Sequence, residues 1–103
     1  MIHVIARIDL APGTRDAFLA EFRKIIPAVL AEQGCIEYGP AIDALTDIGA
    51  QHKAGADHVV VVEKWESVDM LKAHMVAPHM LEYRGKVKAL VQGMQLSILS
   101  PAA

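Results

Sequence analysis

The stretch HVVVVEKW at residues 58–65 decides the fold of this chain. Successive β-branched residues predict a strand. A strand with one face in water alternates apolar and polar side chains, whereas residues 59–62 are apolar on both faces. We therefore expect both faces of this strand to be covered in the folded protein.

Working outward from that strand, the start of the chain predicts another one over residues 2–10. Alternate positions there would share one buried face, and they hold Ile2, Val4, Ala6, Ile8 and Leu10. After the turn signal Pro12-Gly13, helical spacing of apolar residues predicts a helix over 14–33. Pro27 lies inside this helix and is expected to kink or break it, and Gly34 is expected to end it.

The remaining chain adds strands and helices in a simple order. The predicted segments are a strand over 35–46, a loop over 47–57, a helix capped by Ser67, a second helix over 79–91 after a break at Ala77-Pro78, and a strand over 94–99. Pro40 indicates a bulge or an edge position for its strand, because proline cannot donate a ladder hydrogen bond. Gly93 is expected to end the second helix.

The order β-α-β-β-α-β predicts an α+β fold of the ferredoxin-like type, with an antiparallel four-stranded sheet and its helices on one face. The 103 residues fit a single domain, 1–103, with no internal repeat. Helices on one face leave the other face of the valine-rich strand uncovered. A second copy of the same sheet would cover it, so we expect a homodimer.

Composition limits the partners and the compartment. The formal net charge is only −2, which gives no electrostatic footprint for nucleic acid or for an anionic membrane. No apolar stretch approaches the roughly 20 residues of a membrane span, and the start of the chain does not resemble a signal peptide. A single cysteine, Cys35, favours packing over catalysis and fits a reducing, cytoplasmic location.

The sequence offers no familiar cofactor or metal motif. Its seven glycines form neither a G-x-G-x-x-G pattern nor a phosphate-binding loop, so no site for the phosphate groups of a cofactor is expected. Among the five histidines, His74 and His79 miss the i, i+4 spacing that places two metal ligands on one helix face. His52 and His58 flank the predicted loop and are expected to be exposed. We therefore expect no metal site.

Four side chains are candidates for a chemical role, each with a structural alternative. His74 follows Leu71 by three residues, so it is either a general base beside the apolar stripe or a core histidine bonded to a carbonyl. Glu63 shares a strand face with Trp65 and needs a partner such as Arg7, Arg84 or a histidine. Trp65 would either form one wall of a pocket for a flat ligand or pack in the core as an anchor. Tyr38 would present a phenol to a pocket or lie half-buried in the sheet.

Three stretches resemble the antibiotic-biosynthesis-monooxygenase-like (ABM) family. They are "E-x-G-C-x-x-Y" at residues 32–38, "E-x-W" with the following Glu66-Ser67 at residues 63–67, and the set Leu71, His74, Pro78 and His79. The resemblance covers nearly the whole chain in the correct order. It implies a dimeric α+β barrel and a small oxygenase that acts with O2 on quinols or polycyclic phenols without flavin, haem or metal. It also implies His74 as base or proton shuttle, Glu63 as the residue orienting a partner, and Trp65, Tyr38 and His79 around the substrate.

Two departures from the family pattern have consequences. The connection over 45–57 is longer than usual, which could alter the pocket mouth or the dimer rim. The haem-degrading branch uses an asparagine on the first strand, whereas this chain has no asparagine and holds Ala6 at about that place. Haem degradation is therefore not expected. The remaining alternatives are a small-molecule isomerase using the same histidine, and a non-catalytic dimeric ligand-binding or stress-response domain.

Overall fold

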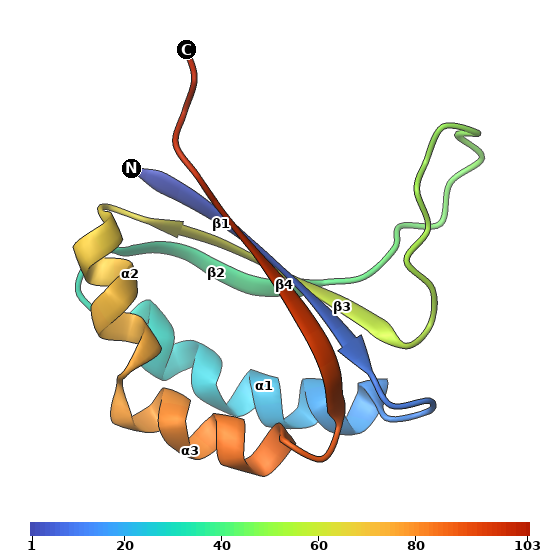
Figure 1. Cartoon of the computed structure of the whole chain (residues 1–103), viewed down its shortest axis with the longest axis horizontal. Coiled ribbons are helices and arrows are strands. Elements are labelled where there is room, and N and C mark those ends of the chain that lie inside the picture. The colour runs from blue at the N-terminus through green and yellow to red at the C-terminus, as the bar shows by residue number, and fades with distance from the viewer.

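The computed structural model describes residues 1–103 and has the element order that the sequence predicts. The strands are β1 (Ile2–Leu10), β2 (Cys35–Ala41), β3 (His58–Trp65) and β4 (Val91–Leu99), and the helices are α1 (Arg15–Leu30), α2 (Val68–Met75) and α3 (Pro78–Val87). All neighbouring strands are antiparallel, in the order β2-β3-β1-β4. Figure 1 shows the helices on one side of this sheet. The predicted α+β, ferredoxin-like fold is confirmed.

The hydrophobic core fills the space between the sheet and the helices. The predicted inward face of β1 is confirmed, because all five of its apolar side chains are buried. Val59 and Val61 of β3 point into the same core, where Phe18, Phe22 and Trp65 are almost wholly buried. None of the three helices is long and apolar enough to cross a lipid bilayer.

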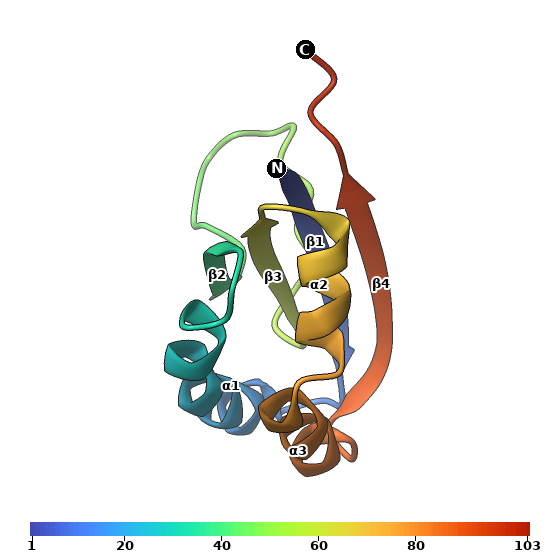
Figure 2. The same cartoon turned by 90° about the vertical axis from the view of Figure 1, so that its left-hand side faces the viewer.

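Two regions of the sheet are less covered by the rest of the chain: the face away from the helices, and the edge strand β4. On the face away from the helices, Val60 and Val62 of β3 are only half-buried, as is Ile5, which pairs with Val62. On the helix-facing side, Met94 and Leu96 of β4 lie opposite buried residues of β1, yet they are exposed. Figure 2 shows the reason, since β4 lies beyond the helices at the edge of the sheet.

Several local predictions are confirmed by their hydrogen bonds. The Ser67 hydroxyl accepts from the backbone N–H of Met70 at 3.2 Å and so caps α2. The second helical region is interrupted between α2 and α3, and Pro78 is the first residue of α3. β2 is an edge strand, as Pro40 indicated, with a register shift between Cys35 and Glu37.

Other boundaries differ from the predictions. α1 is shorter than the predicted helix over 14–33, and it continues unbroken through Pro27. Pro27 lies in the last turn of α1, and its missing backbone N–H removes one intrahelical hydrogen bond without ending the helix there. α3 ends at Val87, and Gly93 lies inside β4 opposite Asp9, so its predicted role as a helix end is wrong.

The connection between β2 and β3 is longer than predicted. β2 ends at Ala41, so the loop spans residues 42–57 and projects away from the sheet in Figure 1. It is held by its own hydrogen bonds, because the Asp43 carboxylate accepts from the backbone N–H groups of Ala54 and Gly55 at 3.1 and 2.9 Å. His52 is exposed as expected, whereas the His58 side chain is largely buried and bonded to Asp9.

Candidate active site

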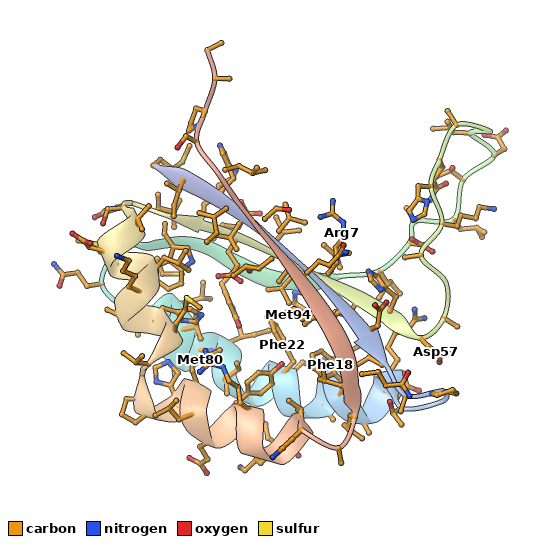
Figure 3. The ribbon with its side chains drawn as sticks, in the orientation of Figure 1. Arg7, Phe18, Phe22, Asp57, Met80 and Met94 are labelled. Atoms are coloured by element: carbon orange, nitrogen blue, oxygen red, sulfur yellow. The ribbon has the colours of Figure 1, made fainter.

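A cavity of about 500 Å³ lies between the sheet and the helices. Of the 20 residues that line it, 15 are hydrophobic. They include Phe18, Phe22, Met80 and Met94, whose positions between the sheet and the helices can be followed in Figure 3. Pockets that bind small organic molecules typically enclose about 300–1,000 Å³ and are mostly apolar. The cavity is thus of a size and character that fit an apolar organic ligand.

His74 is the buried base in the cavity wall. It lies near the end of α2, three residues after the buried Leu71, and its side chain is only 4% exposed. Its Nδ1 lies 2.8 Å from Glu32 Oε2. A carboxylate only accepts hydrogen bonds, so this nitrogen carries the proton and Nε2 keeps the lone pair of the neutral ring. Helical spacing does not determine which way His74 points, and in the structure its side chain lies in the cavity wall.

The surroundings of His74 favour its neutral form. Burial lowers its pKa below the ordinary 6.5, and this effect outweighs the hydrogen bond and the negative charge of Glu32, which raise the pKa. The cationic side chain of Arg84 also lowers it. At neutral pH the imidazole is therefore uncharged and able to accept a proton on Nε2.

Glu63 is a buried carboxyl group on β3 that also lines the cavity. Its Oε1 accepts the Trp65 indole N–H at 2.9 Å and lies 4.0 Å from His74 Nε2. Burial raises the pKa of Glu63 to about 7. Of the partners that the sequence suggested, His74 is the one within 4.0 Å of the Glu63 carboxylate, whereas Arg7 extends from the opposite face of the sheet (Figure 3).

The two predicted aromatic residues take different positions. Tyr38 lines the cavity and its ring stacks on Phe22 with centroids 5.3 Å apart. Burial raises the pKa of Tyr38, so its phenol stays protonated and can donate a hydrogen bond. Trp65 is fully buried, is absent from the cavity lining, and packs on the His74 ring with centroids 4.6 Å apart. Trp65 thus packs against His74 and donates a hydrogen bond to Glu63 outside the cavity, and it does not form part of the cavity wall.

Glu32 is the site residue that the sequence analysis did not select. It lies in the turn after α1, and its Oε2 receives hydrogen bonds from both His74 Nδ1 and His79 Nε2, at 2.8 and 2.9 Å. His79, at the start of α3, is outside the cavity lining and its side chain is 28% exposed. The signal for Glu32 was its place in the "E-x-G-C-x-x-Y" stretch, whose elements the fold brings against α2 and α3.

Glu32, His74 and His79 are also the residues that could hold a metal ion. One ligand atom from each lies within 4.8 Å of the others. Helical spacing along the sequence indicates only pairs of histidines on one helix, whereas here a carboxylate from another element joins histidines of two helices. In the structure His74 Nδ1 and His79 Nε2 each form a hydrogen bond with the Glu32 carboxylate. These hydrogen bonds alone satisfy the three side chains.

Together these residues define a class of site. A small α+β domain holds an apolar cavity, a neutral buried imidazole as base, a carboxyl group of shifted pKa and a phenol that donates. Such a site can remove a proton from an apolar organic molecule and shield the resulting anion from water. Arg84 also lines the cavity and adds positive charge beside it.

The family follows from comparison with known proteins. The sequence pattern of the family described as "Antibiotic biosynthesis monooxygenase" matches residues 1–86, and the chain belongs to this family of monooxygenases. It is 43% identical over 103 residues to the "Probable quinol monooxygenase YgiN" of Escherichia coli K12, with 98% of each chain covered. The predicted family is confirmed.

Solved structures show the same fold. PA3566 from Pseudomonas aeruginosa superimposes with a TM-score of 0.81 at 25% identity, covering 99% of this chain and 94% of that one. Rv0793 from Mycobacterium tuberculosis gives a TM-score of 0.80 at 28% identity, covering 99% and 95%. A protein from Nitrosomonas europaea gives 0.83 at 16% identity over all of both chains, which shows the fold alone.

Proposed function

We propose that this protein is a cofactor-independent monooxygenase that oxidises a quinol or polycyclic phenol with O2. The relative from Escherichia coli, named for quinol oxidation, supports the substrate class. The observation that carries the mechanism is the neutral His74 in the wall of an apolar cavity, with Nδ1 held by Glu32 and Nε2 left as the acceptor. The cytoplasm remains the proposed compartment, which the free thiol of Cys35 fits.

The chemistry starts with proton transfer. His74 Nε2 accepts the proton of a substrate hydroxyl, and the electron-rich anion reduces O2 and binds it at a ring carbon as a peroxide anion. The protonated His74 then returns the proton, which gives the hydroperoxide and restores the neutral base. Cleavage of the O–O bond, with loss of one water, leaves one oxygen atom on the ring as a quinone-type carbonyl or hydroxyl group. Substrate and O2 thus give an oxygenated quinone and water, and the substrate supplies all four electrons that reduce O2.

The other cavity residues assist this reaction. The protonated Tyr38 and the cationic Arg84 line the cavity and would stabilise negative charge on the substrate oxygen. Glu63 orients its partners, because its Oε1 receives the Trp65 indole and Trp65 packs on the His74 ring. Catalysis would rest on positioning, proton transfer and exclusion of water.

Oxygen consumption tests the proposal. With a panel of naphthohydroquinols and anthrols, the wild-type protein should consume O2 faster than the spontaneous rate. His74→Ala should lower the rate by roughly 10²–10⁴-fold, the range for loss of a general base. His52→Ala, which removes an exposed loop histidine, is the matched control and should match wild type.

The outcomes separate the class from the residue. No consumption above the spontaneous rate by the wild type would overturn the monooxygenase and favour the isomerase or ligand-binding alternatives. Turnover that survives in His74→Ala would remove His74 as the base while leaving the class intact.

We also infer a homodimer that pairs the outer faces of two sheets. Ile5, Val60 and Val62 form an apolar centre on the face opposite the helices, and each is only half-buried in the single chain. The polar side chains of Arg7 and Lys64 lie on the same face around this centre. An apolar centre with a polar rim is the usual composition of a protein interface.

A further inference from the structure

Three ligand groups from separate parts of the chain meet at one point beside the cavity. Glu32 lies in the turn after α1, His74 near the end of α2 and His79 at the start of α3. Two imidazoles and one carboxylate are an established ligand set for Zn²⁺, which such a set holds with a fourth position left for water. The cluster therefore has the donor chemistry of a site for a divalent transition metal ion.

The distances within the cluster are close to those around a bound ion. Ligand atoms bonded to one Zn²⁺ ion at about 2.0–2.2 Å are separated from each other by roughly 3.3 Å in a tetrahedral site. Glu32 Oε2 lies 2.8 Å from His74 Nδ1 and 2.9 Å from His79 Nε2, and all three ligand atoms lie within 4.8 Å of one another. Side-chain shifts of roughly 0.5 Å would therefore admit the ion.

An ion can reach the cluster from the protein surface. Side-chain exposure rises from 4% at His74 to 14% at Glu32 and 28% at His79. His74 lines the cavity, whereas Glu32 and His79 do not. The ion would therefore enter beside the start of α3 and would not occupy the space of the substrate.

Glu63 lies where a metal-bound histidine needs a partner. A histidine that ligates a metal generally donates its other ring N–H to a carboxylate or a carbonyl group, which fixes its tautomer. His74 would bind the ion through Nδ1, and its Nε2 lies 4.0 Å from Glu63 Oε1. The same oxygen accepts the Trp65 indole N–H, which holds the carboxyl group in place. A carboxyl group thus lies on each side of the His74 ring.

We propose that Glu32, His74 and His79 bind Zn²⁺ or a similar divalent transition metal ion, and that the bound ion prevents His74 from acting as a base. In the metal-free protein the Glu32 carboxylate accepts a hydrogen bond from each histidine, so the protons lie on His74 Nδ1 and His79 Nε2. The ion takes the lone pairs of these two nitrogens. The proton of each neutral ring moves to its other nitrogen, and none is released.

This exchange of tautomer removes the lone pair on which the proposed reaction depends. Nε2 of metal-bound His74 carries a proton, so it cannot accept one from a substrate hydroxyl. The ion is therefore an inhibitor and not a cofactor. The site replaces the expectation of no metal site that helical spacing gave. Binding of the ion does not rest on the proposed function, whereas its effect on turnover does.

Binding is tested without substrate. Protein freed of metal with a chelator is titrated with Zn²⁺ by calorimetry and with Co²⁺ by visible absorption, which reports the coordination geometry. We expect one ion per chain, with a Kd on the order of 1 μM or lower. His79→Ala and Glu32→Gln each remove one ligand and should weaken binding by about 100-fold or more, beyond the loss of an outer-shell partner.

The variants also separate this site from adventitious binding. His52→Ala removes an exposed loop histidine and is the matched control, which should bind Zn²⁺ as the wild type does. Because Glu32 and His79 belong to different elements, loss of folding in one variant leaves the other decisive. Binding that is unchanged in the folded variants, or absent in the wild type, overturns the site.

The tautomer of His74 is read by 15N NMR. Saturating Zn²⁺ should move the His74 proton from Nδ1 to Nε2 in the wild type and in His52→Ala. A proton that stays on Nδ1 while the ion is bound overturns the proposed ligation by His74.

Turnover tests the inhibition. Saturating Zn²⁺, which has no redox chemistry of its own, should lower kcat for O2 consumption by roughly 10²–10⁴-fold, as loss of the base would. KM should change little, and a chelator should restore kcat. Activation by the ion, or equal inhibition of His79→Ala, overturns the inhibitory role. A wild type that consumes no O2 would refute the proposed function, while calorimetry and NMR would still decide the metal site.

Discussion

Glu63 combines a buried carboxyl group with a raised pKa, so it links stability to pH. Its pKa in the folded chain is about 7, against an ordinary value of 4.5. Between these values the folded state holds the proton and the unfolded state does not, so the free energy of unfolding falls as pH rises through this window. Glu63→Gln removes the charge and keeps an oxygen for the Trp65 indole. We expect it to stabilise the fold at pH 8 by on the order of 3 kcal/mol, and much less at pH 5.

Denaturant unfolding at pH 5 and pH 8, at one protein concentration, checks this prediction. Glu37→Gln is the matched control, because Glu37 pairs with Lys64 at 3.0 Å on an exposed part of the sheet and should change stability little. Equal pH dependence in wild type and Glu63→Gln would contradict the assignment.

His74 makes a prediction of the opposite kind, on activity. Its base form is the neutral ring, and burial lowers its pKa below 6.5, so the acid limb of kcat/KM should lie below that pH. The Glu32 carboxylate raises this pKa, so Glu32→Gln should move the limb to still lower pH while reducing kcat. A pH profile of O2 consumption measures both, and a limb that moves upward would contradict the role of Glu32.

The sequence could indicate single residues only where they share an element. His74 can be selected as a candidate because helical spacing from Leu71 places it beside the apolar stripe. Tyr38 can be selected because the sequence predicts the strand that carries it. Glu32 was not, since its role depends on α1, α2 and α3 meeting at one oxygen. The burial of Trp65 behind His74 likewise depends on packing between β3 and α2, which spacing within β3 does not reveal.

At the scale of elements, Gly34 controls how the end of α1 meets α2. It has φ of +82°, and a Cβ there would lie 2.9 Å from the Met70 Cβ and Cγ atoms. Its carbonyl also accepts the backbone N–H of Glu66 at 2.8 Å, which ties the Glu32 turn to the segment before α2. We expect Gly34→Ala to destabilise the fold by about 2 kcal/mol or more and to lower turnover, because the turn holding Glu32 shifts relative to His74.

Gly13→Ala separates the two causes of that loss. Gly13 has a similar φ of +77°, but a Cβ there meets nothing within 4 Å. It therefore measures the backbone cost alone, and thermal unfolding should show a smaller loss than for Gly34→Ala. Combining Gly34→Ala with Met70→Ala should cost less than the sum of the two single changes. Equal losses at both glycines would exclude the contact with Met70.

The elements themselves were largely predictable because their signals are local. Alternation in β1, the Ser67 cap and the break at Pro78 each depend on residues close in the sequence. The errors in the predicted boundaries arise where hydrogen-bond pairing between strands decides the conformation of a segment. Gly93 looks like a helix end, but antiparallel pairing with Asp9 extends β4 back to Val91.

At the scale of the whole molecule, the apolar content of the chain has two destinations. One is the core with its cavity, which covers Val59 and Val61. The other is the outer face of the sheet, where Val60 and Val62 are left half-covered by a single chain. The four consecutive valines are informative because they place apolar side chains on both faces of one strand. The volume of the cavity could not be predicted, since it depends on how α3 and β4 diverge.

The proposed homodimer can be tested on that outer face with a matched pair of substitutions. Val62 lies at its centre, paired with Ile5 on one side and Gly39 on the other. A lysine there would bury a charge in the apolar part of the interface, so Val62→Lys should weaken association by 100-fold or more, a cost of about 3 kcal/mol. Leu81→Lys places the same charge at an exposed apolar residue of α3 and should leave a dimer. Sedimentation velocity over a range of concentrations distinguishes monomer from dimer. A wild type that stays monomeric, or a Val62→Lys protein that stays dimeric, would place any interface elsewhere.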